Sequence, residues 1–318
     1  MKKSIIAMAV AGALAVPAIA SADATLYGSL RMTVDKTDNV KTDMQDRGSR
    51  LGVRGNVDLG LQDTVGIYQV EFRYNPISGG DFDTRGTANS VTRGGDSFIG
   101  ATGSWGTVMA GIFDHPTYSL VTSRTEISAA ILDVGATTGY ADGGVTNTLA
   151  YVSPNMSGFQ VIAGTVINGG TSDTTTFDGW QLGASFDGVE NLNVGAAYGR
   201  LSSSANLPAQ DQYKWGLAAD YTLDALNVAV SYDRVKDKVA NTTDKGWGVA
   251  GTYNITQDLS AALRYSTAKI TDGDRRKATQ VEVANRMGRG IVSVGYADRN
   301  RQLQNGDDTF YVGYRLDF

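Results

Sequence analysis

The sequence predicts an all-β fold, a transmembrane barrel of sixteen antiparallel, up-and-down strands. The first observation is that apolar and polar side chains alternate in segments of about 9 to 12 residues, the length that a tilted strand needs to cross a membrane. The second is that short and long links alternate between these segments. The third is composition, because 39 Gly and 15 Tyr with 5 Pro and no Cys suit many strands joined by tight turns.

The first 22 residues have the pattern of a secretory signal peptide. The basic start Met1-Lys2-Lys3 is followed by an apolar stretch from Ile5 to about Val16 and by small residues up to Ala22. This apolar stretch is too short to span a bilayer as a helix. We therefore expect cleavage after Ala22, export of the chain, and one barrel domain over residues 23–318.

Alternation is clear from the first strand onward. One face carries Leu26, Leu30 and Val34, and the other carries Tyr27, Arg31 and Asp35. Successive strand residues point to opposite faces, so each segment has one apolar and one polar side. Aromatic residues recur at the ends of the apolar faces, for example Tyr198, Tyr221 and Tyr265, as an interfacial aromatic girdle requires.

Sixteen such segments follow one another along the chain. They cover residues 25–37, 47–59, 64–75, 96–104, 106–114, 146–154, 158–167, 177–187, 190–201, 212–223, 225–235, 246–255, 258–269, 277–287, 290–300 and 307–318. Closure of the first strand on the last removes both sheet edges, because lipid offers no partner for free backbone groups. Composition alone leaves open a soluble β-sandwich or β-helix, but soluble strands usually end near five or six residues.

Six stretches resemble the general porins of Gram-negative bacteria, and the resemblance spans the chain after residue 22. They are Ala24–Gly28, Ser49–Gly55, Ser97–Gly100, Gly106–Gly111, Ala150–Asn155 and Tyr311–Phe318. The resemblance implies an outer-membrane homotrimer whose third loop folds into the lumen. It also implies passive diffusion of ions and small hydrophilic solutes, with no enzymatic activity and no cofactor. Phe318 at the end of an alternating strand resembles the signal that such barrels present to their assembly machinery.

The chain departs from these porins at two places that affect the pore. Ile112 stands where relatives commonly have an arginine, directly after the glycine that closes the fifth strand. The third loop, residues 115–145, also lacks the proline-glutamate-phenylalanine-glycine turn of enteric members. Pore size and selectivity are therefore not carried over from the family.

Arginines gather on the polar register at both ends of the chain. The first strands carry Arg31, Arg50, Arg54 and Arg73, and the last strands add Arg264, Arg286 and Arg315. Because a closed barrel makes the first and last strands neighbours, we expect one basic sector of wall. Between Ser97 and Gly199, by contrast, Arg124 is the single basic residue against eight carboxylates.

The long link 115–145 is the expected constriction loop, and its Glu126 and Asp133 are the candidate acidic side of the pore. Opposed rows of charge in a low-dielectric tube create a transverse field that orients dipolar solutes and filters ions. The plainer interpretation is that the arginines are solvated lumen residues that balance Asp35, Asp58 and Glu71.

Other candidate sites have weaker signals. His115 is the single histidine, and without a recognisable serine motif a structural role is favoured over catalysis. Asp272, Asp274, Asp307 and Asp308 fit ordinary turn carboxylates better than Ca²⁺ ligands. The run Arg275-Arg276-Lys277 is either a solvated loop or a contact for lipopolysaccharide phosphates. The net charge of −5 gives nucleic-acid binding no support.

Two other functions stay open at this point. A solute-specific channel would need an aromatic slide along the lumen, and only scattered inward tyrosines such as Tyr27 and Tyr311 are present. A barrel enzyme or a surface adhesin would have a closed lumen.

Overall fold

The computed structural model describes residues 23–77, 95–127, 132, 135, 138, 144–167, 177–201, 211–270, 275–299 and 308–318. The expected signal peptide, residues 1–22, lies outside the described residues.

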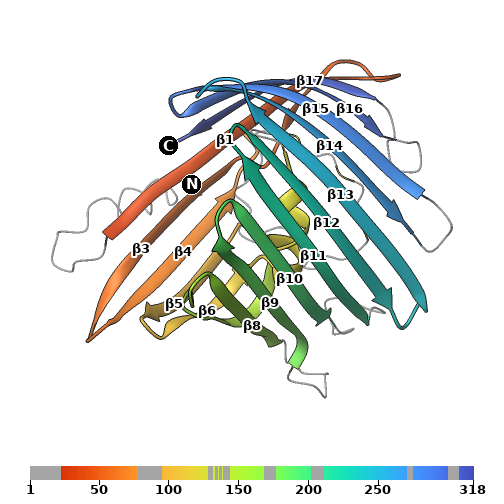
Figure 1. The fold of residues 1–318 in the computed structure, drawn as a ribbon. Coiled ribbons are helices and arrows are strands. Elements are labelled where there is room, and N and C mark those ends of the chain that lie inside the picture. The colour runs from red at the N-terminus through yellow and green to blue at the C-terminus, as the bar shows by residue number, and fades with distance from the viewer. Residues whose placement is uncertain are drawn as a thin grey trace, which may run out of the picture.

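Strands make up nearly all of the described chain (Figure 1). They are β1 (Asp23–Thr37), β2 (Asp43–Asp46), β3 (Arg50–Leu61), β4 (Thr64–Arg73), β5 (Ser97–Gly103), β6 (Gly106–Phe113), β7 (Val145–Val152), β8 (Phe159–Ile167), β9 (Phe177–Val189), β10 (Leu192–Leu201), β11 (Gln212–Leu223), β12 (Leu226–Asp237), β13 (Thr242–Asn254), β14 (Leu259–Lys269), β15 (Arg275–Met287), β16 (Gly290–Arg299) and β17 (Thr309–Asp317). All of them belong to one sheet, in which each pairing is antiparallel.

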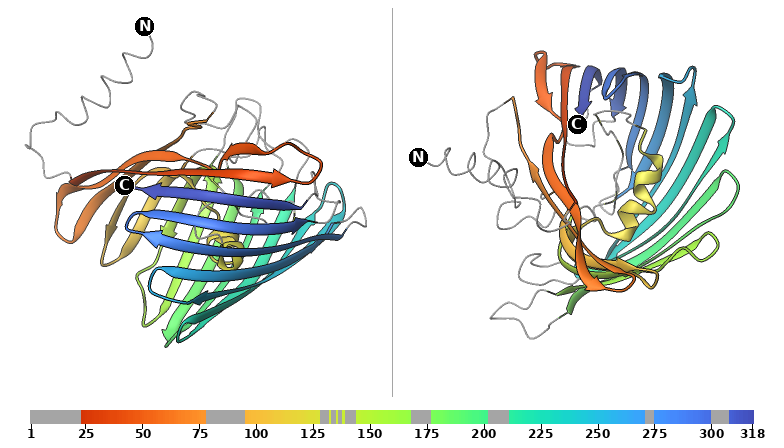
Figure 2. Two further views of the ribbon diagram at one scale, coloured as in Figure 1. Left: turned by 90° about the horizontal axis from the view of Figure 1, so that it is seen from above. Right: turned by 90° about the vertical axis from the view of Figure 1, so that its left-hand side faces the viewer.

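The sheet closes on itself through β1. This strand pairs with β17 from Ser29↔Asp317 to Thr37↔Thr309, and with β3 from Asp23↔Asn56 to Ser29↔Arg50. The short β2 pairs only with the later part of β1, so β2 and β3 follow one line in the wall. The ring therefore has sixteen positions, which confirms the strand count expected from the sequence (Figure 2).

One expected strand differs in detail. Residues 47–59 were expected to run without a break, but the chain leaves the sheet at Arg47–Ser49 between β2 and β3. Gly48 has a φ of 81°, a left-handed conformation that turns the chain out of the extended course of a strand. The Asp46 carboxylate accepts hydrogen bonds from the backbone N–H groups of Gly48 and Ser49, which satisfies the donors released at the break.

Turns at one rim are tight. Asp224 (φ 49°) and Gly288 (φ 63°) are the first residues of the two-residue turns that join β11 to β12 and β15 to β16. Positive φ at this place matches the twist of the flanking strands. The opposite rim carries the longer links, although β12 and β13 extend beyond their expected ends and shorten their link to residues 238–241.

Burial follows the alternation in an inside-out manner. Along β17, Thr309 and Tyr311 are buried, whereas Phe310 and Val312 are 48% and 43% exposed. Large apolar side chains are exposed in the same way on most strands, and buried side chains include charged and amide groups such as Glu71 and Gln181. Apolar residues therefore face the outside of the ring, as they do in lipid.

Two short helical segments interrupt the link between β6 and β7. Helix α2 (Pro116–Ser119) is followed by the 3₁₀ turn η1 (Thr122–Thr125). The ring of His115 caps α2, because its Nδ1 accepts a hydrogen bond of 3.1 Å from the Thr117 backbone N–H. Helix α2 contacts β9 to β11, and η1 contacts β11 to β13 (Figure 2). Among the residues that the model describes, no helix is long and apolar enough to span a membrane.

Candidate pore constriction

Arginines oppose one another directly on the polar register of four neighbouring strands. Arg50 on β3 pairs with Arg73 on β4, and Arg31 on β1 pairs with Arg315 on β17. Like charges directly opposite each other on paired strands are destabilising, so this register lowers the stability of the fold. The expected neighbourhood of the first and last strands is confirmed, and it brings these arginines to one side of the wall.

Glu71 lies within this basic sector. Its side chain is 5% exposed, accepts a hydrogen bond of 3.1 Å from the Tyr27 hydroxyl, and lies 3.7 Å from Arg50. The Arg54 guanidinium lies 5.0 Å from the centre of the Tyr27 ring, a cation–π distance. Arg54 and Arg73 are exposed, whereas the carboxylate between the strands is buried. The free charge that this part of the wall presents to water is therefore positive.

Two more carboxylates stand where links meet this sector. Asp96 precedes β5, and Asp114 follows β6 and accepts a hydrogen bond of 2.8 Å from the Gly144 backbone N–H. Burial raises the pKa of Asp96 to about 6, and the charges of Asp114 and Glu71 act in the same direction. Neither residue was assigned to the pore from the sequence, although Asp114 is one of the eight carboxylates between Ser97 and Gly199. Asp96 and Asp114 lie at the very ends of the expected segments 96–104 and 106–114, next to the links.

The link 115–145 begins against a wall of glycines. A Cβ atom at Gly183 would lie 2.8 Å from Leu120 and Pro116, and one at Gly216 would lie 2.7 Å from Val121. A Cβ atom at Gly195 or Gly199 would overlap the Leu120 carbonyl or the His115 ring. Since these glycines face the same side as the polar register of β9 to β11, the segment occupies space that side chains would otherwise fill.

Polar contacts fix the same segment further along the wall. Arg124 donates a hydrogen bond of 2.6 Å to Asp220 on β11, and Asp220 also accepts one of 2.8 Å from Asn193 on β10. Thr125 and Ser231 on β12 share a hydrogen bond of 3.1 Å. Arg124, the single basic residue between Ser97 and Gly199, is thus paired with a carboxylate of the wall.

Later residues of the link reach β14 to β17. Gln280 on β15 donates a hydrogen bond of 2.7 Å to the Leu132 carbonyl and another of 2.8 Å to the Tyr311 hydroxyl. Gly135 lies beside the Arg264 guanidinium, which is 2% exposed. Arg264 was expected in the basic sector, but its side chain is covered by the link and does not face open water.

Of the two acidic candidates in the link 115–145, the structure describes Glu126. Glu126 directly follows η1, and its carboxylate accepts a hydrogen bond of 3.1 Å from the Tyr118 hydroxyl. Asp133 lies outside the described residues. His115 is 1% exposed, and burial lowers its pKa to about 3, which keeps the ring neutral in its capping role.

The other candidates are placed as follows. Asp272, Asp274 and Asp307 lie outside the described residues, and Asp308 accepts a hydrogen bond from the Tyr296 hydroxyl. Within the described ranges, no group of three or more His, Cys, Asp or Glu residues has the arrangement of a metal site. Arg275 and Lys277 are exposed at the start of β15.

Comparison with known proteins agrees with this geometry. The family model described as "Gram-negative porin" matches residues 7–286. A "Monosaccharide porin" of Halomonas sp is 23% identical over 304 residues, which cover 83% of this chain and 80% of that protein.

Solved structures share the fold. The "Anion-selective porin from Comamonas acidovorans" has a TM-score of 0.74 at 16% identity, over 94% of this chain and 100% of that one. OmpT of Vibrio cholerae, solved in a trimer form, has a TM-score of 0.66 at 17% identity, over 93% of this chain and 99% of that one. The match of the family model over most of the sequence, together with the closed sixteen-stranded ring, decides the assignment. The chain belongs to the Gram-negative porin family and is a diffusion channel of the outer membrane.

Proposed function

We propose that this channel is non-specific or mildly selective, and that solutes pass between a basic wall and the link 115–145. The basic side consists of Arg31, Arg50, Arg54 and Arg73, and the acidic side contains Glu126 and Asp133. This proposal rests on two observations. Arg50 and Arg73 lie directly opposite each other on β3 and β4, and the side chains of Arg54 and Arg73 are exposed. The alternative of arginines balanced by nearby carboxylates applies to Arg50, which lies 3.7 Å from Glu71. Among the described residues, the exposed Arg54 and Arg73 form no such ion pair, and this favours the constriction.

The seat of the link on the opposite wall supports the same proposal. The segment from His115 to Thr125 is held on β9 to β13 by close glycine contacts and by the Arg124–Asp220 pair. A link held there leaves the water path beside β1, β3 and β4, where the arginines lie. Charges at the edge of a narrow path with low-dielectric walls act strongly on a passing ion. No cofactor takes part in such passage, and we infer that the protein catalyses no reaction.

A general channel fits the lumen better than a solute-specific one. The Tyr27 ring is engaged by Arg54 and its hydroxyl by Glu71, and Tyr311 is fully buried under Leu132. Within the described residues, the inward tyrosines therefore do not form a continuous aromatic track for sugars. The Halomonas relative is named a monosaccharide porin, so a sugar-specific channel remains the second candidate.

Export and assembly complete the proposal. Residues 1–22 direct secretion and are removed, and three copies associate as in the trimer form of Vibrio cholerae OmpT. The Phe318 ring is partly exposed, and its backbone exchanges two hydrogen bonds with Gly28, of 3.0 and 3.1 Å. The assembly machinery would recognise this exposed terminal ring, and lipopolysaccharide would surround the finished barrel.

Planar bilayer recordings on the purified detergent-extracted protein test this function. We expect ohmic conductance that appears in steps of three and does not saturate with small sugars. Single uncoordinated steps would contradict the trimer. Saturable block by one sugar would replace the general channel with a specific one. A protein that inserts and conducts nothing would refute the diffusion function and favour a closed-lumen enzyme or adhesin.

A further inference from the structure

A pocket of about 340 Å³ lies in the wall between β1, β3, β4 and β5, and we call it the lumen pocket. Two rows of residues across these strands line it, Thr25–Arg54–Gln69–Phe98 and Asp23–Asn56–Ile67. Residues two apart in a strand face the same side of a sheet. Both rows therefore share a face with Tyr27 and Glu71, which lie on the polar register of β1 and β4. This face is the water-filled side of the wall.

The lumen pocket lies nearer the rim of tight turns than the opposed arginines do. Along β3, Arg54 follows Arg50 by four residues, about 13 Å of strand, in the direction of the turn that joins β3 to β4. Short turns of outer-membrane barrels lie at the periplasmic rim. A solute that enters from outside therefore reaches the lumen pocket after it has passed Arg50 and Arg73.

Arg54 supplies a cation that is available to a ligand. Its side chain is exposed, and across the part of the chain that the structure describes its guanidinium makes no hydrogen bond and no ion pair. The Tyr27 ring, whose centre lies 5.0 Å from the guanidinium carbon, supports one face of the planar group. The N–H donors at the edge of the guanidinium stay available, and a carboxylate accepts two of them in parallel.

Apolar side chains stand beside this cation. Ile67 and Phe98 line the lumen pocket and are half-buried. Phe98 packs edge-on against Phe113, with ring centres 6.5 Å apart and ring planes at 84°, and this contact holds the Phe98 ring in place. A solute that brings an apolar group to Ile67 and Phe98 removes apolar surface of both partners from water, which favours binding.

Asp23 limits the charge that a ligand can carry. It lines the same pocket and is exposed, and within the described ranges no ion pair joins it to Arg54. Asn56, the strand partner of Asp23, adds an uncharged amide. Asp23 would repel a second carboxylate on the solute, so the lumen pocket favours a ligand with a single negative charge.

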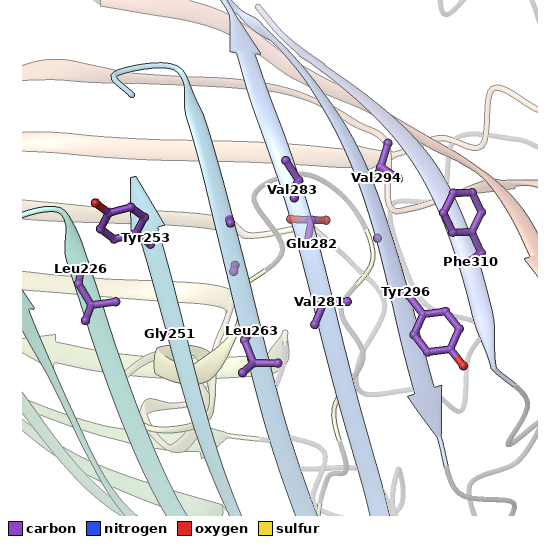
Figure 3. A pocket seen from close by; sticks show the side chains of 13 residues that line it. Leu226, Gly251, Tyr253, Leu263, Val281, Glu282, Val283, Val294, Tyr296 and Phe310 are labelled. Carbon is purple, nitrogen blue, oxygen red and sulfur yellow. The ribbon is translucent and has the colours of Figure 1, made fainter. Parts of the chain in front are cut away.

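A larger groove of about 630 Å³ lies elsewhere, on the outer face of β12 to β17 (Figure 3). Exposed apolar side chains such as Leu263, Val281 and Phe310 line it, so it faces lipid and not the water path. The lumen pocket differs from this groove because it combines a cation with apolar side chains where solutes pass.

We propose that the lumen pocket is a binding subsite for small apolar monocarboxylates, of which benzoate is a simple aromatic example. The carboxylate accepts two N–H donors of Arg54, and the apolar group packs on Ile67 and Phe98. A volume of about 340 Å³ is at the lower end of the range of small-molecule sites and suits one such ligand. The inference rests on the proposed water path beside β1, β3 and β4. It adds a subsite for one class of solute to a channel that passes other small solutes without saturation.

Planar bilayer recordings on the purified full-length protein test the proposal. Benzoate is exchanged for acetate at constant total carboxylate and ionic strength, and the benzoate concentration that gives half of the maximal decrease in conductance is measured. A saturable decrease is expected for the wild type. Arg54→Gln is expected to raise this concentration at least about fivefold, because a charge-assisted hydrogen bond is lost. The matched control is Arg73→Gln, which removes another exposed lumen cation that does not line the pocket and should change the concentration less than about twofold.

Further measurements separate the parts of the proposal. Ile67→Asn is expected to weaken the effect of benzoate, and an unchanged half-maximal concentration would overturn the apolar contact. Benzyl alcohol that acts at the same concentration as benzoate would overturn the role of Arg54. Phthalate, which has two carboxylates, is expected to act more weakly than benzoate, and an equal effect would overturn the preference for a single charge.

Failure of the subsite and failure of the channel give different results. Conductance of each variant in potassium chloride serves as the folding control. A wild type that conducts but shows no saturable effect of benzoate would overturn the subsite alone. A wild type that inserts and conducts nothing would refute the proposed water path together with the subsite.

Discussion

Gly199 on β10 faces the His115 ring so closely that a Cβ atom at position 199 would overlap Nε2. The histidine in turn caps α2, where the link 115–145 begins its course along the wall. One missing side chain on a strand therefore sets the position of a helix that lies beside the water path.

Replacement of Gly199 by alanine should displace His115 and loosen α2. We expect a loss of about 1 to 3 kcal/mol in the free energy of unfolding, typical of an overpacked site, together with noisier single-channel current. Unfolding in denaturant and bilayer recordings measure the two effects. Gly251→Ala is the control, because the nearest atom to a Cβ there lies 4.0 Å away. If the two variants had the same free energy of unfolding and the same single-channel current, the contact between Gly199 and His115 would not position the link.

Removal of the basic wall should shift ion preference. Replacing Arg50, Arg54 and Arg73 together by alanine removes three cations from one side of the water path. We expect the permeability ratio to move toward cations by at least about twofold, because fixed charge of one sign attracts the opposite ion. Reversal potentials in a salt gradient measure this ratio. Lys245→Ala on the outer face is the control, and a reversal potential unchanged by the triple replacement would exclude these arginines from the constriction.

The Arg124–Asp220 pair should couple the link to the wall. The side chains are 25% and 12% exposed, so the pair is only partly screened by water. A double-mutant cycle with Arg124→Ala and Asp220→Ala is expected to give a coupling of about 0.5 to 3 kcal/mol. Chemical unfolding of the four proteins provides the measurement. Additive effects of the two replacements would mean that the contact does not hold η1.

Asp96 should make the pore respond to pH. Its pKa is raised to about 6, so the carboxyl is charged at pH 7 and becomes neutral as the pH falls through 6. Loss of this negative charge beside Arg50 and Arg73 should increase preference for anions at pH 5. Because the folded state binds this proton more tightly than the unfolded chain, the group's contribution to stability is full below about pH 4 and is lost as the pH rises through 6.

Asp96→Asn provides the comparison for this titration. The variant should have the same reversal potential at pH 7 and at pH 5, close to that of the wild type at pH 5. A pH response that persists in the variant would assign the effect to another group.

Alternation predicted the strands and the arginine register because it depends only on neighbouring residues in one chain segment. Arg31, Arg50, Arg54 and Arg73 lie on the expected register for this reason. The break at Gly48 was missed, because one left-handed glycine with an acidic partner leaves no trace in the period of apolar residues.

Alternation does not predict which strands the link 115–145 contacts. Burial of Arg264 and Tyr311 depends on contacts with Gly135 and Leu132 of another segment, and the sequence pattern of their own strands contains no such information. A signal was nevertheless present. Gly195 and Gly199 occupy polar-register positions of β10 where a polar side chain is expected, and glycine in a strand marks a close approach of another backbone or ligand.

The glycines that contact the link, Gly183, Gly195, Gly199 and Gly216, distinguish two regions of the wall that differ in which substitutions they tolerate. On β9 to β11, a larger residue in place of any of these four glycines would collide with the link, so these positions tolerate little change. On β3 and β4, Arg54 and Arg73 have solvent beside them, and other side chains fit there without disturbing the fold. Substitutions on β3 and β4 can therefore change which solutes and ions pass, while the contacts on β9 to β11 keep the link in position.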